Sequence, residues 1–275
     1  MSKDSDIPPG PPTTHACDHC GKSFEVEHLE HFGHWHPSIR HCPDCEMTLR
    51  AVGMYAAYHQ CGRCNKSYIV PDSRYHYERD EFCPNCRPII QTERAEQARL
   101  ERLAEWPRFC PPLYLEHDSA KYPVASKPKL AGVLKWQYGA KGLLLHGESG
   151  TGKTRCAWQL IRRLYIEENR RVIPFDAVSF SHAITKHFGP DGDGEKWLEK
   201  IINVPIVLFD DFGKARLTER GEAEVFGIVE VRMAHCRPMI LTTNFVGETL
   251  AACFRDDVGR ALVRRLRDCC ECIAF

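Results

Sequence analysis

Short apolar runs alternate with amphipathic stretches along the second half of the chain, from about residue 128 onward. The apolar runs predict strands at Gly142–His146, Arg171–Phe175, Val204–Phe209, Met239–Thr243 and Cys272–Phe275. The amphipathic stretches predict helices at Lys153–Glu168, Ala177–Phe188, Glu195–Ile201, Glu219–Ala234 and Gly259–Arg267. Fully apolar strands separated by helices are typical of a parallel sheet buried on both faces. Residues 128–275 are therefore predicted to form an α/β domain with helices on both faces of a parallel sheet.

Charged residues dominate the segment before this domain. From Gln91 to Trp106, glutamates and arginines alternate at helical spacing, and Leu100 and Leu103 form only a thin apolar stripe. This pattern predicts a solvent-exposed connecting helix that Pro107 is expected to end. Further prolines indicate an extended linker leading into the α/β domain, so that helix and linker together occupy residues 91–127: Pro111, Pro112, Pro123 and Pro128. Residues 1–14 are polar and rich in proline, which predicts a flexible tail.

Cysteine pairs repeat within the first 90 residues. The stretch Cys17-Asp18-His19-Cys20-Gly21-Lys22-Ser23-Phe24 resembles Cys61-Gly62-Arg63-Cys64-Asn65-Lys66-Ser67-Tyr68, and each is followed by a second pair, Cys42/Cys45 or Cys83/Cys86. Two copies of one unit are the simplest explanation. Four cysteines in two Cys-x-x-Cys pairs are the ligand set of a tetrahedral structural Zn²⁺ site. We therefore predict two zinc-ribbon-like units, residues 15–50 and 51–90, each with one zinc ion.

Disulfides and an iron–sulfur centre are the alternatives for these cysteines. The chain starts Met1-Ser2-Lys3-Asp4 with no apolar stretch behind it, and no run of about 18 apolar residues occurs, so neither a secretory signal nor a membrane span is predicted. The expected location is the reducing cytoplasm, which favours zinc. Three further cysteines near the end of the chain are predicted to be buried thiols: Cys269, Cys270 and Cys272.

A glycine-rich loop follows the first predicted strand of the α/β domain. It consists of Gly147, Glu148, Ser149, Gly150, Thr151, Gly152, Lys153 and Thr154. A strand before and a helix after this pattern are the context of a phosphate-binding loop, in which glycines let backbone N–H groups surround the phosphates. Lys153 is predicted to contact the phosphates and the Thr154 hydroxyl to bind Mg²⁺. The loop predicts ATP and Mg²⁺ as cofactors.

Polar residues end two later strands. Asp210 is predicted to hold Mg²⁺ through water, and Asp211 to polarise the attacking water. Asn244, after the next strand along the chain, is predicted to orient that water. Arg260 and Arg264 share one helical face, from which an arginine offered to a neighbouring subunit's γ-phosphate would stabilise transition-state charge. Arg264 is the first candidate, and a solvated basic face is the alternative reading.

The order of phosphate loop, Asp-Asp, Thr-Thr-Asn and Arg-x-x-x-Arg resembles the DnaC/IstB-like AAA+ ATPases, which are bacterial and phage helicase loaders and transposition helpers. The resemblance covers about residues 107–275 and includes the lead-in Pro111-Pro112-Leu113-Tyr114. It implies a RecA-like AAA+ core and a homo-oligomer with nucleotide at the subunit interfaces. It further implies binding to single-stranded DNA and to a replicative helicase or a transposase, in the service of DNA replication or transposition.

Two features depart from this family. Asp211 stands where many AAA+ enzymes have Glu, so we expect slow or switch-like hydrolysis. The sequence ends directly after the last predicted strand, so a separate helical lid is expected to be lacking. An adaptor that uses ATP as a switch with little turnover is therefore an alternative to a helicase loader or a transposition helper. Formal net charge is zero, so any basic DNA-binding surface must be local. Whether the zinc units bind protein or nucleic acid stays open.

Overall fold

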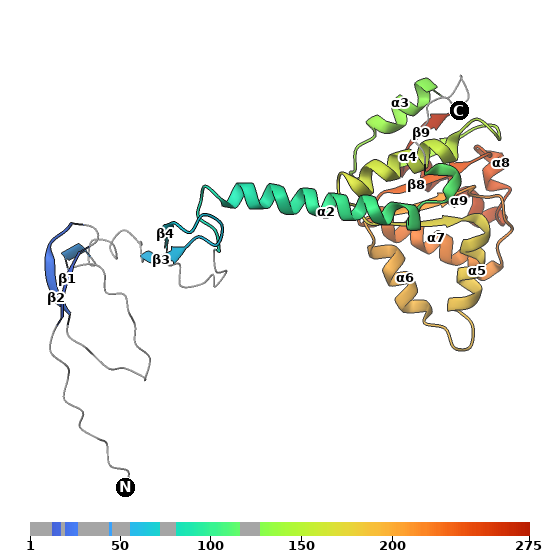
Figure 1. The fold of residues 1–275 in the computed structure, drawn as a ribbon. Helices are drawn as coiled ribbons and strands as arrows, with labels where there is room; N and C mark the ends of the chain where they lie inside the picture. The colour runs from blue at the N-terminus through green and yellow to red at the C-terminus, as the bar shows by residue number, and fades with distance from the viewer. Residues whose placement is uncertain (1–12, 18–19, 27–43, 46–55, 72–80, 116–126) are drawn as a thin grey trace, which may run out of the picture. The chain divides into compact units, whose positions relative to one another are not determined.

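Two units make up the chain, residues 1–94 and 95–275, and each is described by itself. The structure is a computed structural model that describes residues 13–17, 20–26, 44–45, 56–71, 81–115 and 127–275 (Figure 1). Most of the tail predicted over residues 1–14 lies outside the described residues, as does Cys42.

Two hairpins in the first unit have the same turn. Strands β1 (Thr13–Ala16) and β2 (Ser23–Val26) pair antiparallel, as do β3 (Ala56–Gln60) and β4 (Ser67–Pro71). In each turn the first cysteine donates its N–H to a lysine carbonyl, Cys17 to Lys22 at 2.9 Å and Cys61 to Lys66 at 3.0 Å. The residue after the second cysteine has a left-handed backbone in both, with φ of 72° at Gly21 and 59° at Asn65. The sequence repeat is therefore also a structural repeat.

Helix α2 (Arg87–Phe109) begins directly after Cys86 and continues past Pro107, so the prediction that this proline ends the helix was wrong. Proline interrupts a helix because it lacks an N–H and its ring clashes with the preceding turn. Packing compensates for that cost here, because Trp106 is buried at 3% exposure against Phe109, Trp158 and Tyr165.

Polar contacts also attach the second half of α2 to the rest of the second unit. Arg99 forms an ion pair with Glu167 at 2.6 Å, and Arg102 donates two hydrogen bonds to the Ile166 carbonyl at 3.0 and 2.9 Å. The helix predicted to be solvent-exposed throughout is thus packed onto the domain at its carboxyl end.

A helix also stands where an extended linker was predicted. After the short 3-10 helix η1 (Pro112–Tyr114), and beyond the undescribed residues 116–126, α3 (Lys127–Lys135) begins at Lys127. Pro128 does not prevent it, because a proline in the first turn loses no helical hydrogen bond. Leu130 and Val133 bury one side of the helix in the core.

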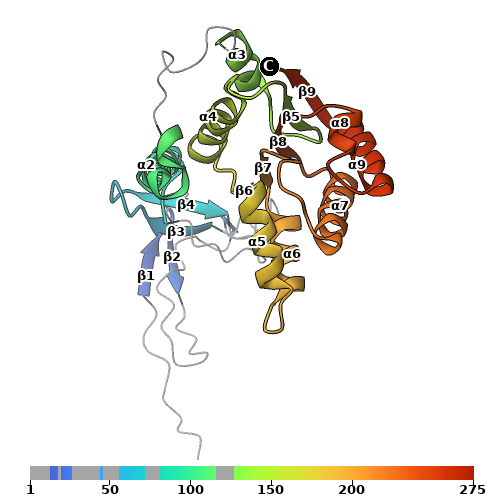
Figure 2. The ribbon, with the colours of Figure 1, turned by 90° about the vertical axis from the view of Figure 1, so that its right-hand side faces the viewer.

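Five parallel strands form the sheet of the second unit, in the order β6-β7-β8-β5-β9 (Figure 2). The strands, in chain order, are β5 (Gly142–His146), β6 (Val172–Asp176), β7 (Ile206–Asp210), β8 (Met239–Thr243) and β9 (Cys270–Ala274). The helices around them are α4 (Lys153–Ile166), α5 (Ala177–His187), α6 (Gly194–Asn203), α7 (Glu219–Ala234), α8 (Glu248–Ala251) and α9 (Asp256–Cys269). The predicted parallel sheet is confirmed, although β9 begins two residues earlier than expected.

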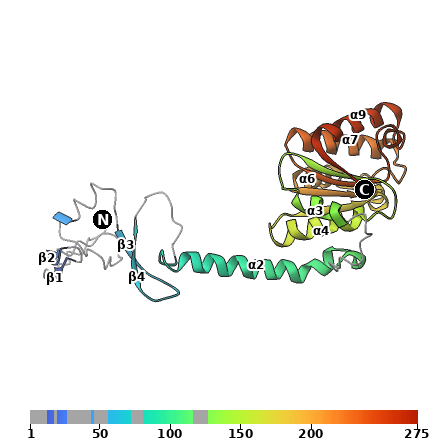
Figure 3. The same cartoon turned by 90° about the horizontal axis from the view of Figure 1, so that it is seen from above.

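Alternate residues of each strand face opposite sides of the sheet. Leu143 and Leu145 pack with α4 and α3 in one cluster of buried residues, whereas Leu144 packs with α5 to α9 in the other. Seen along the sheet, α3 and α4 lie on one side and α7 and α9 on the other (Figure 3). Both faces are therefore covered, as the apolar strands predict. None of the described helices combines the length and apolarity that a membrane span requires.

A fully buried arginine joins the loops that precede two of these strands. Arg232 of α7 has 0% exposure and donates hydrogen bonds to the carbonyls of residues 201, 202, 204, 205 and 238, at 2.7 to 3.1 Å. Burial lowers the pKa of Arg232 to about 10, and its hydrogen bonds are to neutral carbonyls. The guanidinium therefore connects the end of α6 and the start of β7 to the start of β8.

We expect Arg232→Met to lower the free energy of unfolding by about 3 kcal/mol or more, because several buried carbonyls would lose their donor. Urea unfolding followed by circular dichroism measures this change. Arg237→Met is the matched control, since the partners of the Arg237 side chain among the described residues are the Ile202 carbonyl and Asn203 Oδ1 at the same junction. Equal losses for the two variants would contradict the special role of Arg232.

Candidate nucleotide site and metal centres

The loop between β5 and α4 has the backbone that its glycines permit. Gly147, Gly150 and Gly152 have φ values of 140°, 80° and 96°, which side-chain-bearing residues rarely adopt. A Cβ at Gly147 would lie 2.3 Å from the carbonyl oxygen of Phe275, which follows β9. Gly152 is the N-cap of α4, so the loop leads directly into a helix N-terminus, where partial positive charge favours a phosphate.

Lys153, the first residue of α4, is held by the loop itself. Its Nζ donates to the carbonyl oxygens of Gly147 at 2.9 Å and Glu148 at 2.7 Å. Burial lowers the pKa of Lys153, while Asp211 and Asp210 act in the opposite direction. Asp210 ends β7 and Asp211 follows it, so the Lys153 ammonium group lies near the carboxyl end of that strand. From there it can reach phosphate oxygens.

Asp210, the last residue of β7, shares one carboxylate oxygen between two hydroxyls. Thr154 of α4 donates to Asp210 Oδ1 at 2.8 Å, and Thr242 of β8 donates to the same atom at 2.5 Å. Burial raises the pKa of Asp210, and the two hydroxyl hydrogen bonds oppose that rise. The Thr154 hydroxyl and the Asp210 carboxylate are thus adjacent oxygen donors, the type of ligand that Mg²⁺ takes. The structure brings these two predicted residues together.

Thr242 was not predicted as a site residue. Its hydroxyl also accepts a hydrogen bond from the backbone N–H of Asp211 at 2.9 Å, so Thr242 positions both aspartates. The predicted Asn244 lies just beyond β8 and is half-buried, and no hydrogen bond of its side chain occurs within the described part of the chain. Its role in orienting water stays a prediction. The pairing register could have identified Thr242, since β7 and β8 place residues 209 and 241 side by side.

Asp211 departs from the geometry expected of a free catalytic carboxylate. Its φ is 54°, a left-handed conformation that aspartate tolerates in turns. Lys214 Nζ forms an ion pair with Asp211 Oδ2 at 2.7 Å. Tyr114, in the segment that leads into the domain, feels the charges of both aspartates. Burial raises the pKa of the Tyr114 hydroxyl, and the charges of Asp210 and Asp211 add to that rise.

The two candidate arginines lie on the exposed surface of α9, as their spacing predicts. Arg260 makes a distant ion pair with Asp257 at 3.6 Å, and Arg264 is exposed. Neither contacts the phosphate loop or the aspartates among the residues that the structure describes. Arg265, between them and the core, instead pairs with Glu230 of α7. The role of Arg264 toward a neighbouring subunit therefore stays a prediction.

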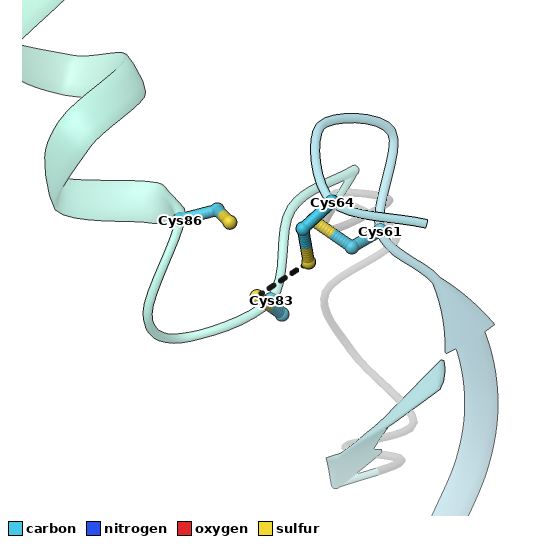
Figure 4. A group of neighbouring side chains, drawn as sticks. All are labelled: Cys61, Cys64, Cys83 and Cys86. Atoms are coloured by element: carbon cyan, nitrogen blue, oxygen red, sulfur yellow. Dashed lines mark hydrogen bonds between the residues drawn. The ribbon is translucent and has the colours of Figure 1, made fainter. Parts of the chain in front are cut away.

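Four cysteines of the first unit converge (Figure 4). The sulfur atoms of Cys61, Cys64, Cys83 and Cys86 all lie within 4.8 Å of one another. Burial raises the pKa of the Cys61 thiol, but backbone N–H groups of Cys64, Cys83 and Arg63 outweigh burial and lower it to about 6. Four sulfur donors at this spacing fit a tetrahedral zinc ion, which holds its ligands as thiolates.

The other cysteines give a mixed result. Cys17, Cys20 and Cys45 also lie within 4.8 Å of one another, and their predicted fourth partner, Cys42, lies outside the described residues. Near the end of the chain only Cys270 is buried. Cys269, the last residue of α9, is half-buried against the core, and Cys272 is exposed on the edge strand β9. The prediction of three buried thiols was therefore wrong for Cys272.

A hollow beside β6 was not predicted. It has a volume of about 420 Å³ and is lined on one side by His187, Trp197, Lys196 and Lys200. The His187 and Trp197 rings are stacked with centroids 5.1 Å apart, and His187 Nδ1 lies 2.6 Å from Asp193 Oδ1. The hollow therefore combines a stacked aromatic pair with two lysines and an aspartate.

Residues 120–275 match the sequence profile of a family described as IstB-like ATP binding protein. The chain belongs to this family. The matched residues include the whole phosphate loop, with Thr154, and Asp210. The RecA-like AAA+ core predicted from the motifs, with Cys-rich units before it, is therefore confirmed as the fold class.

Three proteins are similar to this chain in sequence or in structure. The chain is 24% identical over 136 residues to the uncharacterized protein YdaV of Escherichia coli K12, and the match spans 50% of this chain and about half of YdaV, 54%. The structure of DnaI resembles it with a TM-score of 0.50 and 22% identity, over 60% of this chain and 94% of DnaI. The structure of the DnaC helicase loader gives a TM-score of 0.49 and 22% identity, over 57% and 94%.

The purified protein is expected to contain two zinc ions per chain, because each hairpin carries a converging cysteine set. Cys61→Ser should retain one zinc ion, measured by mass spectrometry of the metal content. Cys236→Ser, which changes an exposed cysteine outside both sets, should retain two. Loss of zinc should expose the first unit to proteolysis, since metal binding contributes to the folding of such small units. A Cys61→Ser protein with two zinc ions would contradict the assignment.

Proposed function

We propose that this protein is an ATPase that assembles on single-stranded DNA and acts on a partner protein in DNA replication or transposition. ATP and Mg²⁺ would bind at the phosphate loop, and the two cysteine sets would hold one zinc ion each. The partner would be a replicative helicase or a transposase, and the site of action the cytoplasm. The active form would be a homo-oligomer with nucleotide at the subunit interfaces.

The arrangement of Asp210 carries the proposal. A half-buried carboxylate that accepts hydrogen bonds from the hydroxyls of Thr154 and Thr242, with its charge acting on Lys153, is what Mg²⁺-dependent phosphoryl transfer requires of a protein. In this site Lys153 would bind phosphate oxygens and Thr154 with Asp210 would hold the metal, which neutralises phosphate charge when bound. Asp211 and Asn244 would orient the attacking water.

Support for single-stranded DNA comes from the order of the motifs and from the hollow beside β6. The hollow combines the stacked His187 and Trp197 rings with the charges of Lys196 and Lys200. Aromatic rings beside cations are typical of surfaces that bind single strands without sequence preference. The motifs do not distinguish a helicase loader from a transposition helper, because the family that this chain resembles includes both. The zinc units would serve for docking to the partner protein or to nucleic acid.

We expect the wild-type protein to hydrolyse ATP slowly and to do so faster with single-stranded DNA. Lys153→Ala should abolish binding of a fluorescent ATP analogue, and Asp210→Asn should lower turnover by about 100-fold because the metal ligand is lost. Lys141→Ala, an exposed lysine before β5, is the control that should leave both unchanged. ATP binding without turnover, with or without DNA, would support the zinc-ribbon adaptor instead.

A mixing experiment tests the shared site. Arg264→Ala should bind ATP but hydrolyse none, because its neighbours offer no arginine. Lys153→Ala should lack nucleotide but still provide Arg264 to the next subunit. Mixed oligomers of these two inactive variants should regain turnover at those interfaces that combine an intact loop with an intact Arg264. Normal hydrolysis by assembled Arg264→Ala would show that the arginine is not required, and Arg260 would be the next residue to test.

A further inference from the structure

One charged group at the site has no part in the proposed chemistry. Lys214 lies in the turn after β7, and this turn is firmly anchored. The Phe212 N–H donates to the Thr242 carbonyl at 2.7 Å, and the Lys214 N–H donates to the Asp211 carbonyl at 3.0 Å. Phe212 is buried against Phe254 of the core, with ring centroids 5.4 Å apart. The backbone therefore presents Lys214 to the aspartates.

The Lys214 side chain binds one aspartate and not the other. Its Nζ is 2.7 Å from Asp211 Oδ2, whereas the described partners of the Asp210 carboxylate are hydroxyl groups. The hydrogen bond that Lys214 donates to Asp211 and the charge of Asp211 raise the pKa of Lys214, and the charge of Asp210 contributes further. The ammonium group thus stays protonated and occupies an oxygen of the carboxylate that would accept a proton from water.

We propose that Lys214 is a positioning residue that restrains Asp211 and thereby keeps ATP turnover low. The proposal rests on the proposed ATPase function and adds a residue to it. During hydrolysis the water oxygen bonds to the γ-phosphorus, the bond from that phosphorus to the bridging oxygen breaks, and the water proton leaves to a base. While Lys214 holds Asp211 Oδ2, that oxygen is not available to accept the proton of the attacking water. Turnover then depends on how often the ion pair opens.

The exposure of the pair limits its effect and makes it adjustable. Lys214 has 62% of its side chain exposed and Asp211 has 33%. Exposed ion pairs are weak and are screened by salt, so the restraint is worth a small factor in rate, about two- to fivefold. A bound partner or DNA phosphate could supply another anion for Lys214 and release Asp211.

We expect Lys214→Met to raise kcat about two- to fivefold at low salt and to leave the affinity for ATP unchanged. Wild-type turnover should itself rise between about 50 and 300 mM salt, while that of Lys214→Met should not, since only the wild type has a pair to screen. Lys214→Arg should keep the wild-type rate. Arg216→Met, which removes a neighbouring exposed cation, is the matched control and should change nothing.

An Asp211→Asn background identifies the target of the lysine. There Lys214→Met should have no effect, because the restrained carboxylate is gone. Equal or slower turnover of Lys214→Met in the otherwise unchanged protein, with a wild-type thermal melt, would overturn the restraint while leaving the ATPase intact. If neither protein hydrolyses ATP although both bind it, the ATPase proposal fails, and the restraint fails with it.

Discussion

The shared carboxylate oxygen of Asp210 is the interaction on which the site depends. It joins three elements, because Thr154 comes from α4, Asp210 from β7 and Thr242 from β8. All three meet only because the strands are parallel and β8 lies between β7 and β5, so that their carboxyl ends share one edge of the sheet. The register of the sheet, and with it the core on both faces, therefore determines where the phosphate loop lies relative to its acidic partner.

Site residues that are neighbours along the chain can be predicted from the sequence. Those that depend on how the strands pair cannot. Eight consecutive residues define the phosphate loop, so strand, loop and helix could be placed in advance. The role of Thr242 depends on which residue of β8 lies beside Asp210, and apolar patterning alone does not give that neighbour. The ion pair of Asp211 and Lys214 requires the left-handed turn at Asp211, for which the sequence Asp-Asp-Phe-Gly-Lys carries no unambiguous signal.

Helix boundaries show the same division. Pro107 and Pro128 are local signals against a helix, and both lie inside one. Burial of Trp106 outweighs the first, and the position in the first turn makes the second harmless. In the first unit the opposite holds: the described apolar cluster there consists of Cys61, Cys83 and Cys86 with Phe82. So small a cluster cannot hold a fold by burial alone, and the cysteine spacing was accordingly the better guide to its structure.

Burial of Asp210 has a consequence for how the site responds to acid. Its raised pKa means that the buried carboxylate takes up a proton more readily than an exposed aspartate does. A proton and a divalent cation compete for the same oxygen, so each metal ion that binds near this pKa must release part of a proton. Acid would therefore weaken metal binding at Asp210, and with it the hold on a metal-bound nucleotide, at a pH above the one at which an exposed aspartate would respond.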